Sequence, residues 1–524
     1  MIIDGKLPAS WIKITISEIC LVNPTVDKSK YADDLLVSFV PMPAVEAETG
    51  RIDVSETKLF QSVKKGYTPF QKDDVLFAKI TPCMENGKMA VVPEVANDIA
   101  FGSTEFQVLR AFSGVLPKFI YYFVSSKMFR QDAEHNMAGA VGQRRVPKPY
   151  LEQSDIPLPP LNEQYRIVAK IEELFSEIDK GVESLKTAKA QLQVYRQALL
   201  KHAFEGKLTA QWRADNPDKV VPAAELLRSI EQAREERYQQ QLTDWQTAIE
   251  KWEFSGKDGK KPSKPKKILD IEQFSDAEKS LLPNLPDNWL WMRLAQIVEK
   301  IQIGPFGSLL HKEDYILDGI PLVNPVHIQA QKIIPHSNST VSQEKIKELG
   351  IYRLKENDIV LGRRGEMGRC AVVNQLEDGW LCGSGSLYIR LLSIETSQFY
   401  CQVLSSRRVK DYLTDSSIGT TMDNLNQNIL NNVPIPLCST TELKVIEEEL
   451  ERQFLYVDRS LADIDLNLQK AEILRQSILK KAFSGQLVPQ DPNDEPASEL
   501  LKRIQAEKVE RETTTKKQKV RSSK

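Results

Sequence analysis

Residues that bind metals or form disulfides are few and scattered in this sequence. The six cysteines include no Cys-x-x-Cys pair, so the sequence indicates neither a zinc ribbon nor a disulfide framework. The five histidines, at positions 135, 202, 311, 327 and 336, lack the His-x-x-x-His and His-Glu-x-x-His spacings of helical zinc sites. We therefore predict reduced, mostly buried thiols, histidines with surface or packing roles, and no metal site.

Long apolar segments are absent as well. The longest apolar run, Phe119 to Val124, is far too short to span a bilayer. Residues 1–20 carry four charged side chains and lack the continuous apolar stretch of a secretion signal. With 41% hydrophobic and 27% charged residues, the composition is that of a globular, non-membrane protein. We therefore expect the chain in the cytoplasm.

Motifs of nucleotide-dependent catalysis are not found. The sequence contains no Gly-x-x-x-x-Gly-Lys-[Ser/Thr] loop and no Asn-Pro-Pro-[Phe/Tyr] of an adenine methyltransferase. The net charge of −2 argues against a protein that coats nucleic acid through bulk charge. DNA binding is still possible, because a groove senses the charge within about 10 Å at physiological salt.

Internal repetition is the strongest feature that the sequence does contain. At one constant offset, residues 199–208 match 478–487, and Glu163, Asp179 and Arg196-Gln197 match Glu442, Asp458 and Arg475-Gln476. With small insertions, Leu7-Pro8-x-x-Trp11 matches Leu285-Pro286-x-x-Trp289, Gly87–Val92 matches Gly368–Val373, and Pro222–Leu227 matches Pro496–Leu501. Each repeat is therefore a globular segment followed by a long helix and a shorter helix.

The long helices are predicted at residues 161–204 and 440–483. The first range has no proline and one glycine, Gly181, and apolar residues recur in both at the seven-residue spacing of a coiled-coil seam. The seam residues are Ile171, Ile178, Leu185, Leu192, Leu199, Leu450, Val457, Ile464, Ala471 and Ile478. We expect the two helices to pack antiparallel, which relates the repeats by a pseudo-twofold axis; the alternative is that each packs on its own domain. Both should end at a glycine, Gly206 or Gly485.

The predicted fold class is α+β, with two mixed α/β domains separated by this antiparallel pair of long coiled-coil helices. The strands are expected to be short, and residues 73–78 and 357–361 are predicted to be equivalent strands. The predicted segments are two globular domains at 1–157 and 285–435, helical regions at 158–255 and 436–506, a linker at 256–284, and a disordered tail at 507–524.

Basic and glycine-rich loops follow the two equivalent strands. Such loops can approach a phosphate backbone, and arginine can also grip guanine bidentately. The candidate DNA-binding residues are Lys79, Lys88, Gln143, Arg144, Arg145, Lys148, Arg363, Arg364, Arg369, Thr420 and Thr421. The alternative is that the charges are merely solvated. The basic segment at 143–148 and its counterpart at 419–426, which has no basic residue, differ, which is expected where two halves read different bases.

Three segments resemble the first conserved region of the specificity subunits of type I restriction-modification enzymes. They are the motif Ile-Pro-Leu-Pro-Pro-Leu-Asn-Glu-Gln at 156–164, the helical segment 171–175 and the ending Ala-Phe-x-Gly-x-Leu at 203–208. Residues 433–487 resemble the second, so the resemblance covers the whole chain in order. The chain departs from the pattern at 436–442, which weakens the inference about partner contacts in the second repeat. The long linker after Trp252 also departs from it, and lengthens the tether.

The resemblance implies a non-catalytic subunit that reads a split site on double-stranded DNA through two target-recognition domains, with the helix length setting the gap. It implies assembly with two modification subunits, which methylate adenine using S-adenosylmethionine, and with restriction subunits that use ATP and magnesium. No cofactor is expected in this chain. The rival interpretations are a self-contained nuclease or methyltransferase, for which no unassigned segment is large enough, and a coiled-coil adaptor that does not bind DNA.

Overall fold

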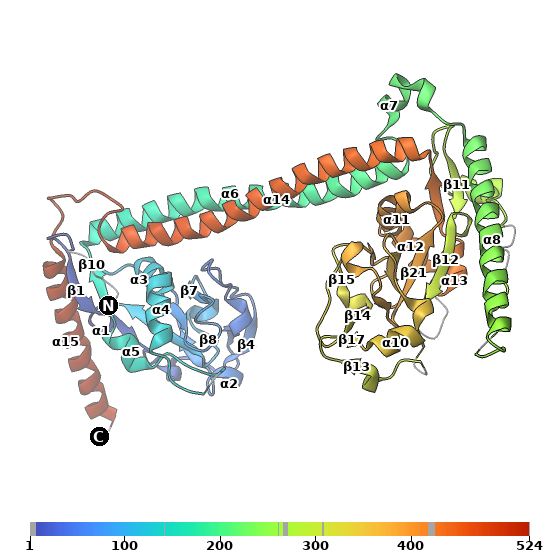
Figure 1. Ribbon diagram of the computed structural model, residues 1–524. Coiled ribbons are helices and arrows are strands. Elements are labelled where there is room, and N and C mark those ends of the chain that lie inside the picture. The colour runs from blue at the N-terminus through green and yellow to red at the C-terminus, as the bar shows by residue number, and fades with distance from the viewer. Residues whose placement is uncertain are drawn as a thin grey trace. The chain divides into compact units, whose positions relative to one another are not determined.

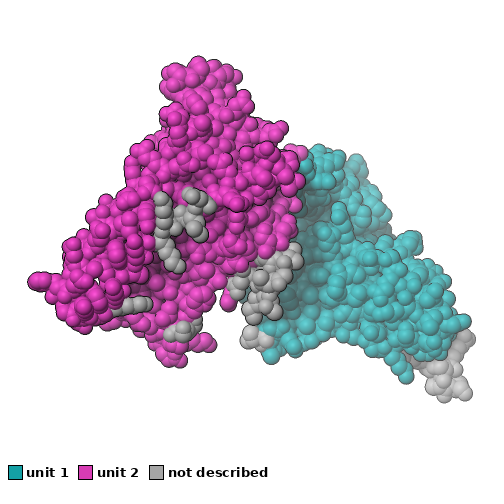
Figure 2. Space-filling view, turned by 90° about the vertical axis from the view of Figure 1, so that its right-hand side faces the viewer, with its two compact units in different colours: residues 1–187, 463–524 teal, residues 188–462 magenta. Residues whose placement is uncertain are grey.

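The computed structural model describes residues 7–140, 142–259, 261–265, 271–306, 309–417 and 425–522, with the side chains of Ser417 and 511–522 left undescribed. The chain forms two compact units, residues 1–187 with 463–524 and residues 188–462 (Figure 2). Two 44-residue helices, α6 (Leu161–Phe204) and α14 (Thr440–Phe483), contribute residues to both units. Within the described ranges, no helix is long and apolar enough to cross a membrane.

The globular domain of the first unit contains two four-stranded sheets (Figure 1). One sheet is antiparallel, with the order β2 (Cys20–Val22), β9 (Phe106–Ala111), β6 (Val75–Ala78) and β7 (Met89–Val91). The other has the order β4 (Thr57–Leu59), β3 (Leu36–Val40), β8 (Ala100–Gly102) and β5 (Thr68–Phe70), with β3 and β8 parallel. A separate pair, β1 (Ile12–Thr15) with β10 (Asp155–Leu158), closes the domain by joining its two ends. The helices are α1 (Ile16–Ile19), α2 (Phe60–Val63), α3 (Pro117–Ser125), α4 (Lys127–His135) and α5 (Lys148–Gln153), with α15 (Ala497–Ser522) added from the end of the chain.

The globular domain of the second unit repeats this plan. Its antiparallel sheet has the order β12 (Val298–Ile303), β21 (Ser386–Leu391), β18 (Ile359–Gly362) and β19 (Cys370–Val372). Its mixed sheet has the order β13 (Tyr315–Ile316), β17 (Thr340–Val341), β14 (Ile320–Val323) and β20 (Leu381–Cys382), with β14 and β20 parallel. The closing pair is β11 (Leu290–Arg293) with β22 (Pro434–Leu437), and β15 (Ile328–Gln329) with β16 (Lys332–Ile333) forms a hairpin. The helices are α7 (Ala210–Asp215), α8 (Ala223–Phe254), α9 (Asp276–Ser280), α10 (Gln343–Glu348), α11 (Ser397–Leu404), α12 (Arg407–Ser417) and α13 (Gln427–Asn431).

A buried ion pair occupies the same place in both antiparallel sheets. The guanidinium of Arg110 donates to the two carboxylate oxygens of Asp74 at 2.7 and 2.6 Å, and Arg390 does the same to Asp358 at the same two distances. Both carboxylates are 1% exposed. A buried carboxylate is tolerated only when it is paired and hydrogen-bonded. The repeated pair therefore fixes the turn that precedes β6 and β18 in each domain.

In the first unit, the beginning of α6 packs against the end of α14. Ile171 of α6 shares a buried core with Ile478 and Phe483 of α14. Arg475 of α14 forms an ion pair with Asp179 of α6, and its guanidinium carbon lies 4.8 Å from the ring centroid of Phe175. This arrangement makes the two helices antiparallel within the unit.

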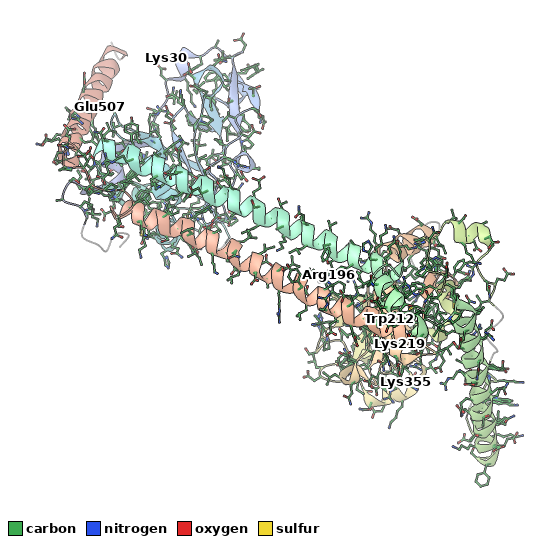
Figure 3. All side chains as sticks on the ribbon, turned by 90° about the horizontal axis from the view of Figure 1, so that it is seen from above. Lys30, Arg196, Trp212, Lys219, Lys355 and Glu507 are labelled. Carbon is green, nitrogen blue, oxygen red and sulfur yellow. The ribbon has the colours of Figure 1, made fainter. Side chains whose placement is uncertain are left out.

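In the second unit the same contacts recur with the helices exchanged. Arg196 of α6 donates to Asp458 of α14 at 2.6 Å, and its guanidinium carbon lies 4.5 Å from the ring centroid of Phe454. Figure 3 shows Arg196 on α6 beside α14. The arginines matched in sequence, Arg196 and Arg475, therefore occupy equivalent positions in the structure. In each half of the helix pair, an arginine of one helix contacts an aspartate and a phenylalanine of the other.

All of the predicted seam residues are at least partly shielded from solvent. Six are buried and four are half-buried. The buried ones are Ile171, Leu199, Leu450, Val457, Ile464 and Ile478, and the half-buried ones are Ile178, Leu185, Leu192 and Ala471.

Both long helices end at the predicted glycine. The φ angles of Gly206 and Gly485 are +68° and +73°, a region that favours glycine. A Cβ at Gly485 would also collide with Pro8, and one at Gly206 would lie 2.6 Å from Cγ of Pro286. Each long helix therefore ends against the globular domain of the other repeat.

Two predicted boundaries need correction. The linker prediction of 256–284 extends too far, because Phe274 is buried beneath the guanidinium of Arg293 and Glu278 pairs with that guanidinium at 2.7 Å. The disordered tail predicted from residue 507 is helical to residue 522, as part of α15. The side chain of Glu507 accepts a hydrogen bond from the backbone N–H of Ser113, an anchor that composition alone does not reveal.

Candidate DNA-binding surface

In the first domain, two predicted basic segments lie side by side. The backbone N–H of Val146 donates to the carbonyl of Lys79 at 2.8 Å, and that of Thr81 donates to the carbonyl of Arg144 at 3.0 Å. The loop after β6 and residues 143–146 therefore form one surface, although they are more than sixty residues apart in the sequence. Gln143 is exposed at its edge, and Lys79 is half-buried within it.

Most cations of this surface have partners within the domain. Arg145 donates to both carboxylate oxygens of Glu105 at 2.9 and 2.8 Å, and this bond holds the pKa of Glu105 below its usual value. Arg144 lies 3.7 Å from a carboxylate oxygen of Glu134, a looser pair in which both side chains are well exposed. Such exposed pairs contribute little stability and can exchange for a phosphate. Sequence reasoning missed both acidic partners, since the turn that brings Glu134 to Arg144 and the strand pairing that brings Glu105 to Arg145 are not visible in the sequence.

Two further candidates of the first domain have local roles. Lys88 donates to the backbone carbonyls of Met42 and Val45 at 3.2 and 3.0 Å, so its ammonium group ties a loop to the sheet. Lys148 lies 3.3 Å from Glu152, one turn further along α5. Of the two, only Lys148 presents its charge largely to solvent.

In the second domain, the loop after β18 occupies the equivalent place. The backbone N–H of Leu425 donates to the carbonyl of Arg363 at 3.2 Å, just as that of Val146 donates to Lys79. Arg363 is only 7% exposed, its Nε donates to the carbonyl of Leu425 at 3.2 Å, and burial lowers the pKa of its guanidinium. Its charge therefore supports the loop from within.

The other arginines of this loop lie further out. Arg364 is exposed, and Arg369 donates to the carbonyl of Pro325 at 3.2 Å and to Glu366 at 2.9 Å. The candidates Thr420 and Thr421 lie outside the described residues. The structure thus brings the first-domain candidates onto one surface and separates the buried Arg363 from the exposed Arg364.

A family model described as the type I restriction modification DNA specificity domain matches residues 8–187 and 286–454. The chain belongs to this family. The two matched ranges contain the two globular domains and parts of α6 and α14, so the internal repeat consists of two DNA specificity domains in one chain. The predicted family and the predicted role as a DNA specificity component are confirmed.

Relatives match over most of the chain. The specificity subunit of the type I restriction enzyme EcoEI from Escherichia coli is 28% identical over 490 residues, which cover 84% of this chain and 77% of that protein. The specificity subunit of EcoAI, also from Escherichia coli, is 29% identical over 398 residues, or 68% of this chain and 62% of that protein. These relatives are named as specificity subunits, in agreement with the prediction that this chain is not itself the enzyme.

Two solved structures share the fold. One, described as the structural basis of complex assembly and conformational transition of the type I R-M system, aligns with a TM-score of 0.64 at 21% identity and covers 92% of this chain and 100% of that chain. The HsdS subunit from Thermoanaerobacter tengcongensis aligns with a TM-score of 0.52 at 20% identity and covers 92% and 99%. The predicted fold class of two mixed domains with a long antiparallel helix pair is confirmed.

The geometry of the first-domain surface predicts one outcome for Lys79 and Arg144 and another for Lys88. Lys79→Ala and Arg144→Ala should each weaken binding to a random duplex and reduce the slope of log affinity against log salt by about one, since each side chain is predicted to contact one phosphate. Lys88→Ala, the matched control, should leave the slope unchanged, because the Lys88 ammonium is bound to backbone carbonyls. Fluorescence anisotropy across a salt series measures all three. If every variant has the same slope as the unaltered chain, the charges of Lys79 and Arg144 are merely solvated and do not contact DNA.

Proposed function

We propose that the chain reads a bipartite site on double-stranded DNA, one half through each globular domain, as the specificity subunit of a type I restriction-modification complex. One observation carries this proposal: the chain contains two DNA specificity domains. Equivalent strands follow the same order in their antiparallel sheets, β2-β9-β6-β7 in the first and β12-β21-β18-β19 in the second. A frame that both domains share, combined with loops that differ between them, suits two domains that read different base sequences. The segments 143–148 and 419–426 illustrate the difference, since the first is basic and the second has no basic residue.

The proposed partners are two modification subunits and the restriction subunits. The repeated contacts of α6 and α14 support two modification subunits, because a repeated framework offers each partner copy an equivalent surface. We place adenine methylation with S-adenosylmethionine on the modification subunits, and ATP and magnesium on the restriction subunits. The chain itself is proposed to hold no cofactor and to act in the cytoplasm.

A domain exchange tests the reading of two half-sites. Residues 16–154 lie between the paired strands β1 and β10, so replacing them with the same region of another family member leaves the closing pair intact. The methylated site should change in one half only, and exchange of residues 294–433 in the second domain should change the other half. Single-molecule sequencing of methylated adenines in the host identifies both. A change in both halves after a single exchange contradicts modular reading.

Native mass spectrometry of the co-expressed complex tests the number of partners. The expected species contains one copy of this chain and two modification subunits. The double variant Arg196→Ala/Arg475→Ala removes the equivalent arginines of both halves, and it should weaken the binding of both copies to a similar degree. A complex with a single modification subunit would contradict the proposal of one partner for each repeat.

A further inference from the structure

An exposed aromatic ring lies beside the loop after β18, residues 363–369, which is called the recognition loop of the second domain below. Phe306 follows β12 in the segment Gly304-Pro305-Phe306, and it is 62% exposed. The backbone of this segment is tightly held, because the N–H of Gly304 donates to the carbonyl of Ser386 at 3.0 Å and a Cβ at Gly304 would collide with the carbonyl oxygen of Gly383. The sheet therefore fixes the backbone two residues before the ring.

The ring lies over the buried arginine of the recognition loop. The guanidinium carbon of Arg363 is 5.7 Å from the ring centroid of Phe306, within the range of a cation–π interaction. Arg363 is itself held by the carbonyl of Leu425. One face of the ring is thus covered by a fixed cation, while its remaining surface is open to solvent.

The first domain has a different residue at the equivalent position. Arg110 and Arg390 are equivalent, and they pair with Leu21 and Lys300 of the neighbouring strand, so the same count along the chain places Asp27 at the position of Phe306. Asp27 is exposed like Phe306. Two readers of different half-sites are expected to differ at positions that touch bases, whereas a position that only stabilises the frame has no such reason to differ.

We propose that Phe306 contacts the methyl group of a thymine in the half-site that the second domain reads. This rests on the proposed function and adds a specificity-determining residue to it. The thymine C5-methyl is the apolar group that base pairs present in the major groove, and phenylalanine is one of the side chains that contact it. Insertion between two bases would need both faces of the ring. The guanidinium of Arg363 covers one of them, which leaves the methyl contact.

Replacement of thymine by deoxyuracil tests this contact directly. The complex of the full chain with its modification subunits is titrated with duplexes that carry the methylated motif of the host, in which the thymines of the second-domain half are replaced by deoxyuracil one at a time. At one position, removal of the methyl should weaken binding about fourfold, the value expected for one buried methyl group. Phe306→Ala and Phe306→Thr should bind the thymine and deoxyuracil duplexes equally well.

Leu376→Ala is the matched control, since Leu376 is an exposed apolar residue of the same domain. It should retain the full dependence on the thymine methyl, as should the unaltered chain. Wild-type binding that responds to no deoxyuracil in this half, or a response that persists in both Phe306 variants, overturns the inference. Failure of the wild-type complex to prefer its motif over a scrambled duplex would instead overturn the proposed function.

Discussion

The structure depends on two buried carboxylates, one at the start of each long helix. Glu163 accepts hydrogen bonds from Nε1 of Trp11 at 2.9 Å and from Gln490, and burial raises its pKa. Glu442 accepts bonds from Asn288 at 3.0 Å and from Thr209 at 2.7 Å. Each carboxylate therefore joins the domain of its own repeat to the segment that follows the long helix of the other repeat. A buried carboxylate without these hydrogen-bond donors would destabilise the fold, so both repeats must come together for either carboxylate to be buried.

Arginines complete this exchange between repeats. Arg213, in the segment after α6, donates to Glu442 and to the carbonyl of Gly206, and so closes the end of α6 onto the second domain. In the other unit, Arg166 of α6 donates to Asp494, in the segment after α14, at 2.6 Å. The frame of each unit is thus built from both repeats. Because the frame does not depend on the loops after β6 and β18, these loops can differ between the two domains. Such differences are required if each domain reads its own half of a DNA site.

The long-range order of the chain could be predicted from its sequence, because it depends on periodic patterns. Seven-residue spacing and a terminal glycine located α6 and α14 correctly, and the matched segments revealed the repeat. The pairing of the domains with the opposite helices could not be predicted, since it depends on single contacts such as Gly485 against Pro8. The linker and tail were misjudged because the polar composition there gave no sign of the anchors at Phe274 and Glu507.

The candidate surface was predicted less well than the fold. Charge and glycine content identified the basic loops, but the same residue types serve several purposes. Lys88 binds backbone carbonyls, Arg363 is buried, and Arg145 is paired with Glu105. The exposed ring of Phe306 carries no charge, so a search for basic residues overlooked it. Only the packing of the loops shows which cations face solvent and which hold the loops in place.

Separation of the chain into its two repeats tests the exchanged packing most directly. Residues 1–265 and 266–524 can be produced together as two polypeptides with a purification tag on the first. Because each long helix ends on the domain of the other repeat, the fragments should co-purify as a one-to-one complex and remain together on size exclusion. Two soluble fragments that elute separately would contradict the account, since each repeat would then be complete without the other.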